Sequence, residues 1–126
     1  MNKKTFIYAS IQKEGYHYFE QALTDPKYAT GDKYDVSHLG TRHFHYFFIK
    51  VWLEVNHSDR DVEFIQFRRW LDELYGNGIL NLNGKSCEMI AEDLYTIIST
   101  KYPKMEVRID VAEDNINGAL VEFRTS

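Results

Sequence analysis

The order of strand-like and helix-like segments predicts an α+β fold for this chain. Two strand patterns come first, two helical patterns follow, and two strand patterns close the sequence, in the order ββααββ. Its 126 residues are the size of one ordinary domain, so we expect a single domain over residues 1–126. The chain is 44% hydrophobic and has two prolines, which favours a packed core over disorder.

The first strand pattern is short. Residues 5–12 are apolar, β-branched or aromatic, as is typical of a strand. We expect Glu14 and Gly15 to break it, and residues 15–19 to form a second short extended piece. Residues 24–37 are polar and predict a long loop, of the kind that is often functional in a compact domain.

Residues 43–55 form the strongest strand pattern. Its alternation places two histidines, His43 and His45, on the same face as a row of apolar residues. That row is Phe47, Ile49, Val51, Leu53 and Val55. The opposite face also carries large apolar groups such as Phe48 and Trp52, so we expect both faces to be partly covered, as contacts between subunits would do.

Two helices are predicted in the middle of the chain. The first spans residues 62–75, with Asp59 or Asp61 as its N-cap and glycine at position 76 ending it. Its expected apolar stripe is Phe64, Phe67, Leu71 and Leu74. After a connector at residues 79–84, Ser86 is expected to cap the second helix, which runs to about Tyr102. Its expected buried stripe is Met89, Ile90, Leu94, Ile97 and Ile98.

The last two strands are predicted to form a hairpin. Residues 105–113 alternate cleanly, with three β-branched residues on one face and Glu113 at the end of that face. Residues 114–118 read as a turn, and residues 119–124 as the closing strand.

Composition excludes several classes of function. The net charge is -4 and no basic tract is present, so we expect no nucleic-acid polymer as a partner. A single cysteine, Cys87, excludes a disulfide framework and a cysteine-rich zinc finger. Residues 1–6 lack the apolar segment of a signal peptide, and no apolar run approaches the ~20 residues that span a membrane. We therefore expect a cytoplasmic protein without a membrane partner.

The spacing of His43 and His45 favours a metal site. Residues i and i+2 of a strand project to the same side, with Cα atoms roughly 6.5–7 Å apart, so both imidazoles can reach one cation. Zinc suits such a pair, and His17 in the neighbouring extended piece could supply a third ligand. Other residues could supply it equally: Glu20, Asp35 or His38. The alternative is that the two histidines are unrelated surface or core residues.

Five short motifs occur in the order found in one enzyme family. They are Gly15-Tyr16-His17, His43-Phe44-His45, Glu63-Phe64-Ile65-Gln66-Phe67-Arg68, Lys85-Ser86-Cys87-Glu88-Met89-Ile90-Ala91 and Ile109-Asp110-Val111-Ala112-Glu113. With them the chain resembles the 6-pyruvoyl-tetrahydropterin synthase and 6-carboxy-tetrahydropterin synthase family over most of its length. In the family the third motif has the form Asp-Phe-x-x-Leu-Lys and the fourth has the form Pro-Thr-x-Glu-Asn-x-Ala, so the match is partial.

The resemblance implies a tunnelling fold, in which an antiparallel four-stranded sheet carries two helices on one face. It implies Zn2+ as the cofactor, with His17, His43 and His45 as its ligands. It also implies that Glu113 anchors a pterin by accepting hydrogen bonds from a ring N–H and an amino group. The ligand-binding residues are then expected to be Glu113, Glu88, Ser86 and Cys87. Family members assemble as trimers stacked into hexamers, so we expect a homohexamer or another homo-oligomer.

The position of Glu113 in the sequence supports two interpretations that do not depend on the family resemblance. A carboxylate that ends an apolar strand face needs hydrogen-bond donors, and a 2-amino-4-oxo heterocycle offers a bidentate pair. The alternative is that Glu113 is the first residue of the polar turn that follows.

The chain departs from the family at its acid and base groups. The family has a cysteine shortly before the His-x-His pair, whereas residues 35–38 contain none, and Gly76 and Asn77 stand where the family has Asp-His. Catalysis would need a replacement from Asp35, Ser37 or His38.

Three functions therefore remain open. The first is a zinc-dependent, lyase-like activity on a pterin or purine derivative. The second is a binding protein that sequesters a purine nucleotide or pterin without turnover, as the similarity to short synthase-like proteins of phage genomes suggests. The third is a relic with neither metal nor ligand. Aromatic residues near the first histidine could stack on a base. They are Tyr16, Tyr18, Phe19 and Tyr34.

Overall fold

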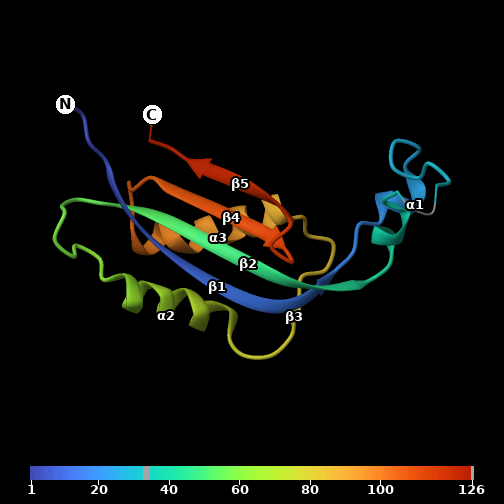
Figure 1. Cartoon of the computed structure of the whole chain (residues 1–126), viewed down its shortest axis with the longest axis horizontal. Coiled ribbons are helices and arrows are strands. Elements are labelled where there is room, and N and C mark those ends of the chain that lie inside the picture. The colour runs from blue at the N-terminus through green and yellow to red at the C-terminus, as the bar shows by residue number, and fades with distance from the viewer. Residues whose placement is uncertain (33–34, 126) are drawn as a thin grey trace.

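The computed structural model describes residues 1–32 and 35–125, apart from the side chain of Ser37. Five strands form one mixed sheet in the order β3-β1-β2-β4-β5, and the two long helices, α2 and α3, cover the same face of it (Figure 1). The α+β class is therefore confirmed. Within the described residues, no helix is both long and apolar enough to cross a membrane.

Strand β1 (Thr5–His17) is continuous, so the predicted break at Glu14 and Gly15 is wrong. It pairs along its whole length with β2 (His43–Val55), antiparallel, from Thr5 opposite Val55 to His17 opposite His43. Gly15 is instead a place of close approach. A Cβ atom there would lie 3.2 Å from the Leu82 side chain and 3.3 Å from the Leu80 carbonyl oxygen.

The neighbour that approaches Gly15 is an additional strand, β3 (Leu80–Asn81). It lies within the predicted connector and pairs with β1 in parallel, with Leu80 opposite Gly15. The sheet thus has five strands and one parallel pairing, where four antiparallel strands were expected. A strand of two residues is too short to produce a recognisable alternation, which is why the sequence did not predict it.

Helix α2 (Phe64–Tyr75) is capped by Glu63, whose Oε2 accepts hydrogen bonds from the backbone N–H groups of Ile65 and Gln66 at 2.7 and 3.1 Å. The prediction of Asp59 or Asp61 is wrong, because Asp61 accepts from the Asn56 N–H instead. The helix buries Phe67 and Leu71, whereas the two outer members of the predicted stripe, Phe64 and Leu74, are exposed.

Helix α3 (Cys87–Lys101) begins as predicted, because the Ser86 hydroxyl accepts a hydrogen bond from the Met89 N–H at 3.2 Å. Its buried residues are Cys87, Ile90, Ala91, Leu94 and Ile98. Met89 and Ile97 are exposed, so the predicted stripe was too wide.

Strands β4 (Val107–Glu113) and β5 (Asn117–Phe123) form the predicted hairpin, although β5 begins two residues earlier than expected. Asp114 and Asn115 turn the chain with positive φ angles of 53° and 56°. The inward faces of β1, β2 and β4 pack against both long helices and make the core.

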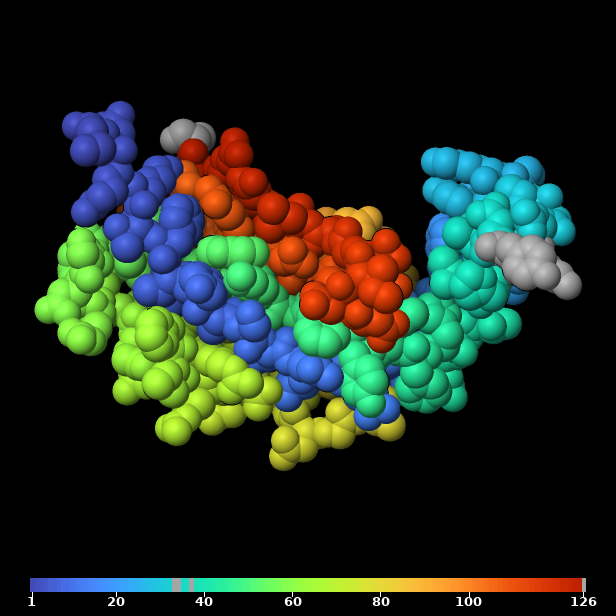
Figure 2. Space-filling view, in the orientation of Figure 1, coloured from blue at the N-terminus to red at the C-terminus, as the bar shows by residue number. Residues whose placement is uncertain are grey.

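The predicted loop at residues 24–37 lies beyond the end of the sheet in its described parts, and residues 33 and 34 of it lie outside the described residues. It is flanked by the short helix α1 (Gln21–Thr24) and the 3-10 helix η1 (Ser37–Gly40), which pack against each other. Figure 2 shows this lobe standing apart from the β4–β5 hairpin, with a hollow between them.

Candidate metal centre

Three histidines meet where β1 ends and β2 begins. His17 lies directly opposite His43, and His45 lies two residues further along the same face of β2. Their ring centroids are 4.6 to 5.4 Å apart, and one nitrogen from each ring lies within 4.8 Å of the other two. The structure therefore brings together the three residues that the sequence predicted as metal ligands, close enough to hold one ion.

Each ring is oriented by an acceptor behind it. The Nδ1 atoms of His17 and His43 lie 3.0 and 2.8 Å from the backbone carbonyl oxygens of Lys85 and Thr41. The Nδ1 atom of His45 lies 2.6 Å from Oδ2 of Asp114. Carbonyl and carboxylate oxygens only accept, so Nδ1 carries the hydrogen in all three rings. In a neutral ring the lone pair is then on Nε2, as in protein metal sites whose outer partners fix the tautomer.

The three Nε2 atoms are buried and have no hydrogen-bond partner within the described residues. Buried polar atoms of this kind are rare without a partner such as an ion. Glu113 Oε1 lies 2.9 Å from Nε2 of His17, and Oε2 lies 3.4 Å from Nε2 of His45, but neither contact has the alignment of a hydrogen bond. Three unpaired imidazole nitrogens beside a carboxylate fit a divalent cation.

The charges in the cluster are coupled. Burial disfavours a charged His17, yet the Glu113 carboxylate and the Lys85 carbonyl raise its pKa overall. Burial lowers the pKa of His43, and the neighbouring His17 and His45 lower it further. Contact with His17 lowers the pKa of Glu113 in spite of burial, so its carboxylate is ionised at neutral pH.

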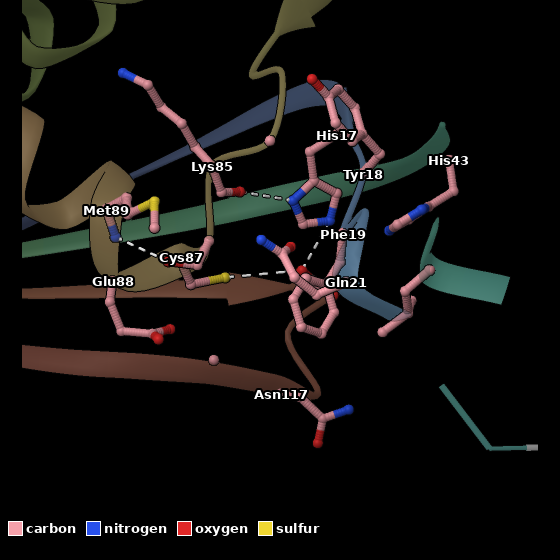
Figure 3. A pocket seen from close by; sticks show the side chains of 15 residues that line it. His17, Tyr18, Phe19, Gln21, His43, Lys85, Cys87, Glu88, Met89 and Asn117 are labelled. Carbon is pink, nitrogen blue, oxygen red and sulfur yellow. Dashed lines mark hydrogen bonds and ion pairs between the residues drawn. The ribbon is translucent and has the colours of Figure 1, made fainter. Parts of the chain in front are cut away.

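A cavity of about 410 Å³ opens beside the histidines, within the range of small-molecule sites. Figure 3 shows His17 and His43 on one side of it and Cys87, Glu88 and Met89 on the other. The four residues predicted to bind a ligand all line it. They are Glu113, Glu88, Ser86 and Cys87.

Cys87 faces Glu113 across this cavity. Its Sγ atom lies 3.9 Å from Glu113 Oε1. Burial, together with the negative charge of Glu113, raises the pKa of the thiol to about 12. Cys87 is therefore a neutral thiol that can donate to the carboxylate, and it is not a thiolate nucleophile.

Two of the three candidate replacement acid and base groups lie away from the site. Asp35 accepts a hydrogen bond from the Thr30 hydroxyl, His38 is exposed, and neither lines the cavity. The side chain of Ser37 lies outside the described residues. The alternative third metal ligands, Glu20, Asp35 and His38, are not part of the histidine cluster.

The aromatic residues near His17 divide between the two faces. Tyr18 and Phe19 line the cavity. Tyr16 alternates to the opposite face of the sheet, where its ring contacts Phe44 and Arg42. Tyr34 lies outside the described residues. Two of the four candidates are thus placed where they could stack on a ligand.

The sequence did not identify Asp114, Gln21 or Asn117 as site residues. Asp114 orients His45, and Gln21 and Asn117 offer amide groups to the cavity. Nothing in their local sequence signals these roles, because each depends on which segments the fold brings together.

A comparison with models of known protein families found no match, and a comparison with curated proteins also found none.

Proposed function

We propose that this protein binds Zn2+ through His17, His43 and His45 and takes a pterin- or purine-type heterocycle into the adjoining cavity. One observation carries the proposed metal site: three buried Nε2 atoms converge, none of them with a hydrogen-bond partner among the described residues, while each Nδ1 is held by an acceptor. Neutral imidazoles in this arrangement are typical zinc ligands.

Three histidine ligands favour zinc over magnesium or calcium, which prefer oxygen. Copper and nickel also bind imidazole, and metal analysis separates them from zinc. A zinc ion would supply a Lewis acid that polarises a ligand oxygen. The protein would contribute the three acceptors that hold each Nδ1 hydrogen and so direct each Nε2 toward the ion.

The heterocycle half of the proposal is supported by the cavity lining. The ionised carboxylate of Glu113 can accept a pair of N–H hydrogen bonds, as a 2-amino heterocycle offers, and Tyr18 and Phe19 offer ring faces. The motif resemblance to the 6-pyruvoyl- and 6-carboxy-tetrahydropterin synthases supports the same ligand class. With it we propose the tunnelling fold and an oligomer of trimers.

The charge of the cavity favours a heterocycle without phosphates over a nucleotide. Glu88 and Glu113 contribute two carboxylates, and the one cationic residue of the described lining, Lys85, is paired with Asp93. A phosphate group would therefore meet repulsion in this chain. Sequestration of a purine nucleotide signal, with a role in phage, remains the second candidate, and a cation contributed by another subunit would be needed for it.

We propose binding rather than turnover. Neither Asp35 nor His38 reaches the cavity, and Cys87 is a buried, neutral thiol. A lyase-like reaction needs a proton acceptor other than the anchoring carboxylate. Incubation with dihydroneopterin triphosphate followed by product analysis tests this: turnover comparable to that of a synthase would contradict the proposal.

Metal analysis of untagged protein tests the zinc site. We expect stoichiometric zinc in the wild type and its loss in His17→Ala, His43→Ala and His45→Ala. His57→Ala is the matched control, because His57 is exposed and pairs with Asp61 in the loop after β2. A wild type without bound metal, also after incubation with zinc, would refute the metal half.

Ligand extraction tests the heterocycle. Mass spectrometry of small molecules released by denaturation is expected to find a pterin or purine derivative. Calorimetric titration with a pterin and with guanosine, before and after Glu113→Gln, is expected to show binding that the substitution weakens. Equal affinity in wild type and variant would remove Glu113 as the anchor.

A further inference from the structure

Both oxygens of Glu113 face the histidine cluster. Glu113 is the last residue of β4 and lies opposite Phe47 of β2, two residues along the same strand from His45. One oxygen lies 2.9 Å from Nε2 of His17, and the other lies 3.4 Å from Nε2 of His45. The carboxylate also lines the cavity, so it borders the cavity and the histidine cluster at once.

These contacts need a positive charge between their atoms. The Nδ1 hydrogens of His17 and His45 are donated to Lys85 and Asp114, so a neutral ring would direct its Nε2 lone pair at a carboxylate lone pair. A proton on His17 would relieve the shorter contact alone. It would leave Nε2 of His43 buried and unpaired. One cation shared by the three rings and the carboxylate relieves all of these contacts.

The distances agree with shared coordination. Zinc bonds of about 2.0–2.1 Å at a tetrahedral angle place two ligand atoms about 3.3 Å apart. The separations of 2.9 and 3.4 Å between Glu113 oxygens and histidine nitrogens lie on either side of this value, without hydrogen-bond alignment. Only one of the two oxygens can occupy the fourth vertex of a tetrahedron made with the three histidines, and either oxygen is near enough to a histidine nitrogen to do so.

The geometry points to Glu113 as the fourth ligand of the metal in the protein without heterocycle, a ligand that the heterocycle displaces. This inference rests on the proposed metal site. The metal then has four protein ligands, three histidines and one carboxylate, and no open coordination position. A heterocycle with paired N–H donors opens one position when it hydrogen-bonds to the carboxylate and displaces it from the metal. The Cys87 thiol, 3.9 Å from Oε1, donates to the carboxylate from the cavity side.

Cobalt(II) is the probe for this closed centre, because its visible absorption depends on the number and kind of ligands. Metal-free protein is loaded with Co2+, and spectra and affinities are compared for the wild type, Glu113→Gln and Asp110→Asn. Asp110 lies on the same strand but alternates to the opposite face, so its substitution changes the charge equally without touching the cluster. Azide is then added as a small anion that occupies open coordination positions.

We expect the wild type and Asp110→Asn to give the intense spectrum of a four-coordinate site that azide leaves unchanged. Glu113→Gln is expected to bind Co2+ at least ~10–100-fold more weakly, the loss typical of an outer-shell partner, and to respond to azide. Thermal melting of the metal-free proteins checks that the variant is folded.

Each outcome separates the inference from the proposed function. An azide response in the wild type itself would overturn the closed centre, whatever the variant does. Identical spectra and affinities in wild type and Glu113→Gln would overturn it too, while leaving the three-histidine site intact. Failure of the wild type to bind Co2+ or zinc at all would refute the metal site on which the inference rests.

Discussion

Asparagine at position 114 would test how far one outer carboxylate controls the metal site. Asp114 accepts the Nδ1 hydrogen of His45 on Oδ2 at 2.6 Å and the Tyr46 N–H on Oδ1 at 2.9 Å. An amide has one oxygen, so Asp114→Asn leaves one of these two donors facing an NH2 group. Asparagine tolerates the positive φ of 53° at this position, so the backbone of the turn is preserved.

The expected loss follows from the tautomer of His45. If the amide oxygen stays on Tyr46, the Nδ1 hydrogen meets a donor, and the ring must turn or move its proton to Nε2, where it blocks the metal. Loss of such an outer partner weakens metal binding by about 10–100-fold, or about 1.4–2.8 kcal/mol. The other two rings are held by backbone carbonyls and are unaffected.

Competition with a chromophoric chelator at pH 7.5 measures the zinc affinity. Asp110→Asn is the control, because it removes the same charge from β4, the strand that precedes the turn, on the face opposite to the histidines. If Asp114→Asn binds zinc within about twofold of Asp110→Asn, the role of Asp114 in fixing His45 is refuted. Melting of the metal-free variants separates this effect from misfolding.

Three further predictions concern stability. Leu71→Ala removes a fully buried side chain and should lower the free energy of unfolding, measured by urea denaturation, by about 2–5 kcal/mol. Leu74→Ala, at a 37% exposed position of the same helix, should lower it by clearly less. Equal losses would contradict the assignment of the buried face of α2. Gly118→Ala should lower the free energy of unfolding by about 1–3 kcal/mol, because its Cβ would lie 2.3 Å from the Val111 carbonyl oxygen. An unchanged melting temperature would contradict this close approach of β5 to β4. Hydrogen bonds from Lys4 and Thr125 lower the pKa of Glu106 although burial opposes them, so the stability that Glu106 contributes is present above its unfolded pKa of about 4.5 and is lost as the pH falls through the lower folded value. The difference in stability between wild type and Glu106→Gln should accordingly shrink on acidification, and a difference independent of pH would argue against this ion pair.

Features that depend on neighbouring residues could be predicted from the sequence. The Ser86 cap joins residues three apart, and the shared face of His43 and His45 follows from the alternation of a strand. The cap of α2 shows the limit of such prediction. Asp61 and Glu63 both have side chains that can cap a helix. The Asp61 carboxylate accepts a hydrogen bond from the Asn56 N–H in the preceding loop, so Glu63 is the residue that caps α2.

Features that depend on register could not be predicted from the residues alone. Gly15 suggested a break because glycine weakens strands, but its neighbour β3 requires the absence of a side chain. Asp114 suggested only a turn, since its contact with His45 depends on how the turn folds back beside Tyr46.

The sequence by itself determined the α+β class, the order of the main elements, the inward face of β2 and the shared face of His43 and His45. Alternation and helical spacing are local properties, and they survive in any tertiary arrangement. Only the tertiary structure decided that His17 stands opposite His43, that Glu113 turns both oxygens toward their nitrogens, and that Lys85, Thr41 and Asp114 fix the tautomers. The physical reason is that a metal site needs atoms within a few ångströms of one point, and strand register, not sequence distance, sets those separations.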